Sequence, residues 1–325
     1  MSEIRFRQVL GQGRAYWGGA ALLALLAFAG FLASRRMEEL GHVITGMNNQ
    51  IVWGMPHVFA VFLIVAASGA LNVASVASVF GRAEYKPLAR LSGLLAIALL
   101  AGGLAILVLD LGRPDRIGVA MTYYNFRSIF AWNILLYTGF MTLTALYLWV
   151  QMEPRLNPHT RTVGTAAFIW RFVLTTGTGS IFGFLVARDT WDSAVMPPLF
   201  IAMSLSIGLA IFLLVLMAAC RWSGRPLGDA LLLRLKNLLG ILAAAVLYFL
   251  LVFHLTKLYK AKYHAVEHFL LAGGQPYAPL FWVGVVCIGG LLPLALFYLP
   301  ALRASRRAIV AGALAIIVGG VALVY

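Results

Sequence analysis

The chain has 325 residues, of which 62% are hydrophobic and only 11% charged, and its formal net charge is +14. Apolar runs of about 20 residues recur along it, and each is long enough to cross the hydrocarbon core of a bilayer. Because these runs lack the alternating pattern of barrel strands, they predict helices. We therefore expect an all-α integral membrane protein. Its excess of Lys and Arg is expected to report on the two sides of a membrane and not on binding of nucleic acid.

Nine transmembrane spans are predicted in chain order. The first follows three arginines, as a signal peptide would, but Arg35 and Arg36 come after it without a clean small-residue cleavage site, so we expect a retained helix. The last span ends at Tyr325, which leaves a further C-terminal tail or helix open. The nine spans are 16–33, 55–80, 90–110, 128–150, 163–187, 195–219, 237–256, 278–299 and 308–325.

The loops between the spans differ in charge, and the difference predicts an orientation. One set of loops, together with the N-terminus, carries 15 Lys and Arg residues, whereas the loops 34–54, 111–127, 188–194 and 257–277 carry 9. The more basic set is predicted to be cytoplasmic, so the N-terminus is placed on the cytoplasmic side of a bacterial-type inner membrane. Five of six histidines and seven of eleven acidic residues fall on the less basic, extracytoplasmic side. We expect the titratable chemistry there, although acids are also depleted from positive-inside loops in general.

The second span opens with the sequence WGMPH, in which Trp53 and His57 are four residues apart and share a helix face. Pro56 suits the first turn of a helix. This pattern predicts a histidine at the membrane edge that can give a hydrogen bond or a proton to a ligand. The alternative is an interfacial tryptophan beside a hydrated histidine.

The stretch 109–133 joins the third and fourth spans and carries charges at the membrane edge, where they are costly unless paired or hydrated. Pro114 is predicted to end the third span just after Arg113. Asp110 and Arg113 would then share the last helical turn and could form an ion pair. The alternative is that these charges form only a structural, ion-paired turn between two helices.

The second half of that stretch, TYYNFRSIFAWN, leads into the fourth span. Asn125 is predicted to cap the helix, with Ser128 and Trp132 following on one face. Tyr123 and Tyr124 precede them and bring two phenolic hydroxyls to the same membrane edge. Side chains of these types can bind the carbonyl groups of a ligand.

Cofactor ligands are scarce in the chain. Cys220 and Cys287 lie in apolar runs without a CxxC motif, so no cysteine-ligated iron–sulfur cluster is expected in this chain, and no metal site is predicted. Only His57 and His254 lie at span ends, which is too few for two bis-histidine haems, and no haem is expected. Arg171 falls inside the fifth span, where it can pair with an acid or water, or extend to the inner surface.

An ordered set of motifs resembles a known family. These are WGMP at 53–56, DLGRP at 110–114, YNFRS at 124–128, DTW at 189–191 with PPLF at 197–200, and FW at 281–282 with PL at 293–294. Together they resemble the NrfD/PsrC family of polysulfide reductase membrane subunits, especially the longer, DsrP-like members of sulfur-metabolism complexes. The resemblance runs from about residue 50 to 299. It implies a core of two four-helix bundles behind an extra N-terminal helix, with domains at 1–50, 51–190, 191–307 and 308–325.

The resemblance also implies a function. Members of the family exchange electrons between the membrane quinone pool, menaquinone or ubiquinone, and an iron–sulfur partner, here expected on the extracytoplasmic face with room for further membrane subunits. Such a subunit is not expected to be active alone. A secondary transporter for a small solute or ion, or a purely structural anchor, are the alternatives. The candidate catalytic residues are His57, Asp110 and Arg113, and the candidate quinone-binding residues are Trp53, Tyr123, Tyr124, Asn125, Ser128 and Trp132.

Overall fold

The computed structural model describes residues 13–51, 53–111, 113–273 and 275–325. These residues form helices and turns without any strand, which confirms the predicted all-α, multi-pass membrane architecture. Eight helical stretches are long and apolar enough to span a bilayer within the described ranges. They are α1 (Arg14–Leu40), α2 with α3 (Met55–Ala70 and Asn72–Ser78), α4 (Lys86–Leu109), α6 (Ile129–Met152), α8 (Met196–Trp222), α9 (Asp229–Leu258), the stretch from α11 to α12 (Tyr277–Tyr298) and α13 (Arg306–Val324).

The predicted span 163–187 corresponds to α7 (Thr160–Gly183), which is not among these eight. Several threonines and Arg171 lower its mean hydropathy, although its 24 residues are sufficient to cross a bilayer. It packs against α6 on one side and α8 on the other. Four of its polar residues, Arg171, Thr175, Thr178 and Ser180, are therefore buried inside the protein.

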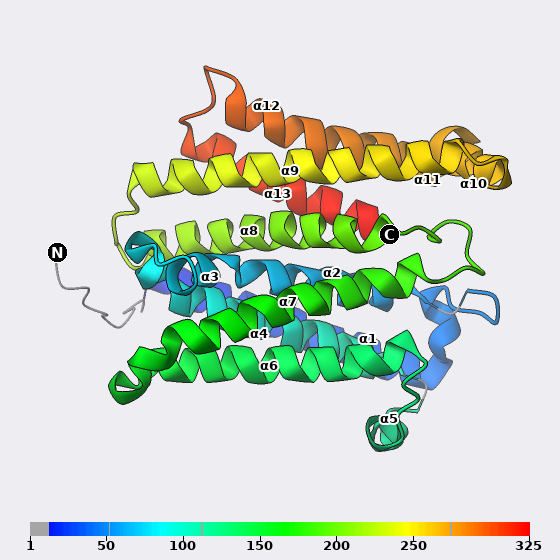
Figure 1. Ribbon diagram of the computed structural model, residues 1–325, viewed down its shortest axis with the longest axis horizontal. Coiled ribbons are helices and arrows are strands. Elements are labelled where there is room, and N and C mark those ends of the chain that lie inside the picture. The colour runs from blue at the N-terminus through cyan, green and yellow to red at the C-terminus, as the bar shows by residue number, and fades with distance from the viewer. Residues whose placement is uncertain (1–12, 52, 112, 274) are drawn as a thin grey trace.

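Two apolar clusters hold the helices together. One joins α2, α3, α4, α6 and α7 around residues such as Leu100 and Phe140. The other is built mainly from α8, α9, α13 and the stretch that ends in α12 (Leu292–Tyr298), with Phe212 and Phe297 fully buried in it, and it also includes residues of α2 such as Phe62. The helices α2 and α8 lie side by side in the middle of the molecule and are the most buried of the eight (Figure 1). The predicted domain boundaries remain predictions.

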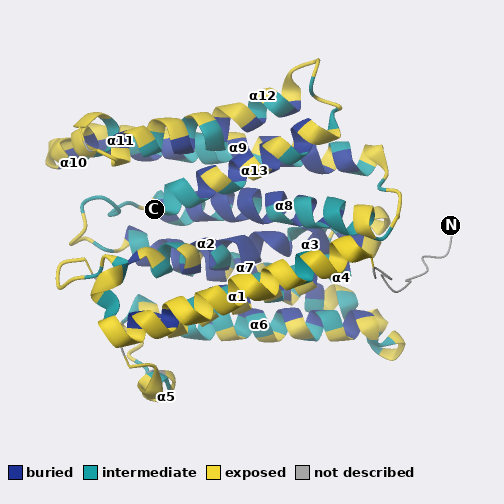
Figure 2. Cartoon of the chain, turned by 180° about the vertical axis from the view of Figure 1, so that it is seen from behind, coloured by how far each residue is buried: buried dark blue, intermediate teal, exposed yellow. Residues whose placement is uncertain are grey.

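The N-terminal helix α1 lies outside both clusters. Figure 2 shows it crossing the outside of the bundle as an exposed ribbon, and only Ser34 and Met37 are buried along its length. Its apolar residues therefore face outward, as expected of a helix surrounded by lipid. The 3₁₀ turn η1 (His42–Thr45) follows it directly and leads into α2.

The stretch before α12 is built from several short pieces. The helix α10 (His264–His268) is followed by a π-helical segment at Phe269–Gly273, then α11 (Tyr277–Pro279) and a second π-helix, η7 (Leu280–Leu291). A Cβ atom on Gly289 would lie 2.7 Å from the Cα atom of Gly319 in α13. Glycine therefore lets these two helices touch backbone to backbone.

Four connections meet at one end of the molecule, on the right in Figure 1. They are the segments 41–54, 110–128, 184–195 and 259–276, and we call this end the site end. It includes α5 (Ile117–Thr122), which projects away from the bundle below α6. The four loops that were predicted to share one side of the membrane are therefore on one side, while the choice of side stays a prediction.

Cysteine labelling decides that choice. In a chain whose Cys220 and Cys287 are replaced by Ser, an impermeant thiol reagent added to intact cells is expected to label Ile117→Cys in α5. Pro226→Cys, in the exposed turn between α8 and α9 at the opposite end, is expected to react only after permeabilisation. The physical reason is the excess of Lys and Arg at the Pro226 end. The reverse pattern would invert the orientation.

Candidate functional site

Asp110 is a buried carboxylate at the site end of α4. It forms the C-cap of α4 and is only 5% exposed. Its Oδ2 atom is in direct contact with Nδ1 of His57 in α2, and its Oδ1 atom lies 3.7 Å from Nδ1 of His42 in η1. Within the described part of the chain, neither carboxylate oxygen accepts a geometrically complete hydrogen bond. The structure thus joins three elements through one buried carboxylate and two imidazoles.

This arrangement is suited to proton exchange. A carboxylate that leaves water is costly unless it is paired, and here the two histidines supply the pairing. Histidine is the side chain whose charge changes most readily near neutral pH. The side chains of His42 and His57 are 23% and 22% exposed, whereas that of Asp110 is 1% exposed. The histidines therefore stand between the buried carboxylate and the surroundings.

Trp53 provides an aromatic wall beside this group. Its ring stacks on the His57 ring, with centroids 5.9 Å apart, and on the Trp191 ring, with centroids 5.4 Å apart. The rings of Phe130 and Phe182 meet it edge-on. The wall thus combines residues from the α1–α2 connection, α6, α7 and the α7–α8 loop. Stacked and edge-on contacts of this kind fix the orientation of the rings.

Gly54 explains why the loop with His42 can approach so closely. It is buried, and a Cβ atom there would lie 2.7 Å from the carbonyl oxygen of Thr45 and 2.8 Å from Cγ of Met47. The Thr45 hydroxyl in turn donates to the carbonyl oxygen of His42 at 2.7 Å. The absence of a side chain at Gly54 therefore lets η1 lie against the start of α2 and places His42 over Asp110.

The predicted ion pair between Asp110 and Arg113 is wrong. The helix α4 ends at Leu109, so Arg113 is not on its last turn. A residue before proline is driven out of helical conformation, and Arg113, preceding Pro114, has an extended φ of −138°. Its guanidinium instead donates to Asp115, with Nε–Oδ1 and Nη2–Oδ2 distances of 3.1 and 3.0 Å. This bond holds the pKa of the exposed Asp115 carboxyl below its usual range.

The predicted cap at Asn125 is also wrong, because α6 begins only at Ile129, with Ser128 as its N-cap residue and no side-chain cap bond. The Oδ1 atom of Asn125 accepts from the backbone N–H of Arg127 instead, at 3.1 Å. The Trp132 indole donates to the carbonyl oxygen of Phe126 at 2.9 Å.

The remaining residues of this stretch also interact locally. Tyr124 stacks on Phe126, and Tyr123 is 82% exposed. Among the residues described, the side-chain hydrogen bonds and ring contacts of Tyr124, Asn125 and Trp132 stay within 124–132. The structure therefore brings together Trp53, His57 and Asp110, and leaves the other six predicted site residues outside that cluster.

Comparison with known proteins decides the family. A sequence model described as polysulphide reductase, NrfD, matches residues 43–325. This chain belongs to the NrfD family. The matched range begins just after His42 and includes Trp53, His57 and Asp110, so most of the candidate site lies within the family region. The helix α1 precedes it, in agreement with the expectation of an extra N-terminal helix.

Relatives of this NrfD chain are subunits of several oxidoreductases. It is 29% identical over 279 residues to the Hdr-like menaquinol oxidoreductase integral membrane subunit of Archaeoglobus fulgidus, which covers 86% of this chain and 69% of the relative. It is 24% identical to the C subunit of selenate reductase from Mesobacillus selenatarsenatis, with 85% and 73% covered. It is 26% identical to the C component of polysulfide reductase from Wolinella succinogenes, with 76% and 83% covered.

Arg171 of this NrfD chain neither pairs with an acid nor reaches the surface. It is 2% exposed, and its guanidinium donates to Oδ1 of Asn72 at 3.1 Å and to the carbonyl oxygen of Ser68 at 3.4 Å. The rings of Phe168 and Phe172 lie 4.9 and 4.6 Å from its central carbon. Amide oxygens and aromatic faces therefore stabilise this buried cation, and the extension to the inner surface considered from sequence is wrong.

Sequence reasoning missed His42, Phe182 and Trp191 as parts of the site. His42 was counted only among the five histidines of the less basic side, and it reaches Asp110 because its loop packs closely against Gly54. Trp191 was noted only within the DTW motif, yet it stacks on Trp53, which is 138 positions earlier in the sequence. In the described ranges no group of three or more His, Cys, Asp or Glu side chains is arranged to hold a metal ion.

Proposed function

We propose that this chain is the quinol-reactive membrane subunit of a multi-subunit oxidoreductase, with its reactive site at Trp53, His57, His42 and Asp110. The observation that supports this most directly is the buried Asp110 carboxylate held between two imidazoles beside an aromatic wall. Membership of the NrfD family agrees with a redox subunit. A transporter would instead be expected to place its charged groups near the midplane of the membrane, away from the site end.

The residues of the site fit a quinone or quinol. The ring of such a molecule is flat and apolar, and the exposed part of the Trp53 wall offers a surface on which it can stack. The Asp110 oxygens are buried against the histidines, so a hydroxyl group of the ligand would meet the partly exposed imidazole of His57, with the carboxylate behind it. A bound quinol supplies two-electron chemistry that is coupled to the release of two protons.

The chain's own task is to move those protons. In the direction of quinol oxidation, the imidazole of His57 accepts a proton from the ligand, and the adjacent Asp110 carboxylate stabilises the imidazolium or takes the proton from it. His42, in contact with the other carboxylate oxygen and 23% exposed, is placed to pass that proton to water. Trp53 holds the ring in place by stacking and limits the access of water from the α7–α8 loop. For quinone reduction, the same groups would deliver the protons.

The names of the relatives support a finer proposal for the ligand and for the partner subunits. Because the Archaeoglobus relative is a menaquinol oxidoreductase subunit, we propose menaquinol in preference to ubiquinol. The selenate and polysulfide reductase relatives are the C components of their enzymes, which suggests a complex with other polypeptides. We propose an extracytoplasmic iron–sulfur partner docked at the site end, and a sulfur-metabolism, DsrP-like complex as the finer assignment.

We also propose that the residues next to α5 lie at the rim of the site, because α5 projects from the same end of the molecule. The proposed ligand or partner contacts are Tyr123, Tyr124, Asn125, Ser128 and Trp132. Arg113 pairs with Asp115 and is not proposed to take part in proton transfer.

Purification of the complex from native membranes tests the proposal. The complex is expected to contain a cluster-bearing partner and to reduce that partner's clusters when a menaquinol analogue is added. The chain alone is expected to show no haem or iron–sulfur absorbance, because it lacks the ligands. Stoichiometric haem in the isolated chain, or a complex whose clusters do not respond to any quinol or quinone, would refute the proposal. A partner bound only at the end that carries Pro226 would refute the placement of the site.

A further inference from the structure

The second group of helices contains a large apolar hollow that the proposed site does not use. Its cavity volume is about 180 Å³, and it lies between α8, α9, η7 and the end of α13. Small-molecule pockets are mostly apolar with a few polar groups, and this hollow has that character. The wall is mainly aromatic and aliphatic, with Trp191, Phe200, Phe253, Phe281 and Tyr277 among its rings.

His254 is the imidazole in this wall, and a buried carboxylate orients it. Its Nδ1 atom lies 2.7 Å from Oε2 of Glu267, which is 0% exposed. With the carboxylate as acceptor, Nδ1 carries the proton and Nε2 is left as the acceptor for a ligand. The second oxygen of Glu267 has no hydrogen bond in the described ranges. The His254–Glu267 pair thus repeats, in the second group of helices, the pairing of His57 with Asp110 in the first.

Charged and polar contacts hold in place the loop that carries Trp191, one of the residues that line the hollow. Lys257 is 1% exposed, donates to the backbone carbonyl of Asp189 and interacts electrostatically with Glu267. The Tyr263 hydroxyl donates to Oδ2 of Asp192 at 2.9 Å, and Lys262 pairs with Asp189 at 2.9 Å. The loop that carries Trp191 is therefore tied to the segment after α9, and the buried Glu267 has a nearby cation.

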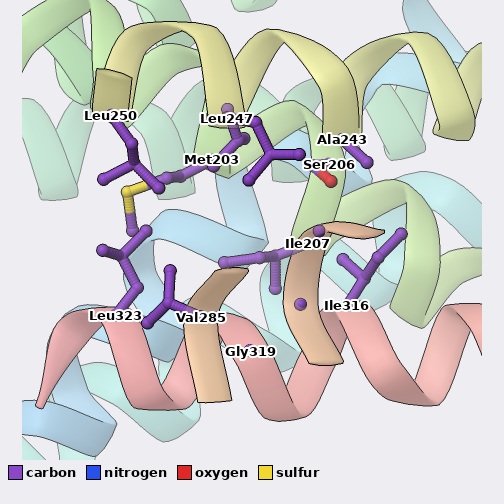
Figure 3. Close-up of a pocket in the computed structure, with 14 residues that line it drawn as sticks. Met203, Ser206, Ile207, Ala243, Leu247, Leu250, Val285, Ile316, Gly319 and Leu323 are labelled. Atoms are coloured by element: carbon purple, nitrogen blue, oxygen red, sulfur yellow. The ribbon is translucent and has the colours of Figure 1, made fainter. Parts of the chain in front are cut away.

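A smaller apolar pocket, whose lining residues are drawn in Figure 3, adjoins the hollow. Its cavity volume is about 30 Å³, it lies between α8, α9, η7 and α13, and its lining includes Gly319 at the glycine contact of η7 with α13. The two pockets share Met203, Leu250, Val285 and Leu323. A ligand with a polar ring near His254 could therefore continue as an apolar chain along these four residues.

We infer that the hollow at His254 is a second binding site for a quinone-class molecule, an apolar ring with a hydroxyl or carbonyl group and an isoprenoid chain. The inference rests on the proposed function, because it assigns a second site for the same class of ligand. An aromatic wall receives the ring, Nε2 of His254 accepts from a hydroxyl of the quinol, and the adjoining pocket takes the start of the isoprenoid tail. A phospholipid chain would fill the apolar walls but would leave the oriented imidazole unused.

The aromatic wall of the first site is also a wall of the second. Trp191 stacks on Trp53 at 5.4 Å and lines the hollow, and Phe182 contacts Trp53 edge-on and lines the hollow as well. The aromatic side chains of Trp191 and Phe182 thus separate the His57–Asp110 group from the hollow at His254. Two ligands can bind at one end of the molecule without sharing a position.

Photolabelling tests the inference. The full complex in nanodiscs is treated with an azido-quinone, and the labelled peptides are identified by mass spectrometry. Label is expected near His254 and Phe281 as well as near His57. Leu270→Phe and Leu270→Trp, which fill the hollow from its half-buried rim, are expected to lower the second labelling stepwise, to less than one-tenth for Trp. Leu271→Trp, at a half-buried neighbour outside the wall, is the matched control and is expected to leave labelling unchanged.

The outcomes separate the two proposals. Label near His57 alone would overturn the second site while the proposed function stands. Label near His254 alone would support the second site, and it would contradict the placement of the reactive site at His57 and Asp110. Label that an excess of phospholipid displaces but unlabelled menaquinone does not would overturn the inference in favour of a lipid cavity. No specific label at either place would overturn both. Equal loss with Leu271→Trp and Leu270→Trp would also overturn it, because the effect would not depend on filling the hollow.

Discussion

Replacing Asp110 with Asn is expected to lower quinol-dependent turnover of the assembled complex by about tenfold or more, the scale of lost acid–base catalysis. The amide keeps the shape of the side chain but can no longer accept a proton between His42 and His57. Because the residue is almost fully buried, water cannot take over that task. Turnover is measured with a menaquinol analogue, and reduction of the partner's clusters by a chemical reductant is expected to stay unchanged.

Asp115 provides a matched control for this substitution. It lies five residues further along the chain, is exposed and pairs with Arg113, so Asp115→Asn is expected to change turnover by less than about twofold, as for a surface ion pair. Arg113→Ala is expected to resemble this control because its partner is Asp115. Normal turnover in a correctly assembled Asp110→Asn complex would remove Asp110 from the mechanism. An effect of Arg113→Ala as large as that of Asp110→Asn would restore the role predicted for Arg113 from sequence.

The sequence was sufficient to predict the helical spans and the two residues at the centre of the candidate site. Spans of about 20 apolar residues dictate helices in lipid, so most of the architecture follows from composition. His57 and Asp110 were identified because each lies where an apolar run meets a polar loop and next to or within a motif, WGMP or DLGRP, that resembles the NrfD family. That rule finds titratable groups at the membrane edge, but it does not say which of them touch.

The contacts within the site depend on backbone detail that helical spacing does not report. The helix α4 ends at Leu109, four residues before the predicted end at Arg113, so Arg113 does not share a helical turn with Asp110. The reason is that Pro114 forces the preceding residue out of helical conformation. His42 entered the site because its loop packs closely against Gly54, and Trp191 entered it through the packing of α7 against α8. The polar α7 was predicted correctly as a helix. Its threonine hydroxyls can donate to carbonyl oxygens one turn earlier in the same helix, as the Thr175 hydroxyl does to the carbonyl oxygen of Arg171.

The crossing of α2 and α8 is expected to be the position at which a single methyl group is most damaging. A Cβ atom on Gly69 would overlap the carbonyl group of Ser204 and lie 3.1 Å from the backbone nitrogen of Leu205. On the other side, a Cβ atom on Gly208 would overlap the backbone of Gly69 and Ala70. Backbone atoms cannot rotate away as a side chain can, so the two helices would have to separate. Small residues at such crossings are what allow membrane helices to pack closely.

Gly69→Ala is therefore expected to lower the free energy of unfolding by more than about 3 kcal/mol, at or beyond the upper range for overpacked cores. Thermal unfolding of the purified complex measures it. Gly102→Ala in α4 is the matched control, because its Cβ atom would meet only Cδ1 of Leu63, at an ordinary 3.6 Å, and is expected to change stability by less than about 1 kcal/mol. Since α2 also carries His57, any Gly69→Ala complex that survives is expected to lose quinol turnover as well. Equal melting temperatures for the two variants would mean that α2 and α8 do not touch at Gly69 and Gly208.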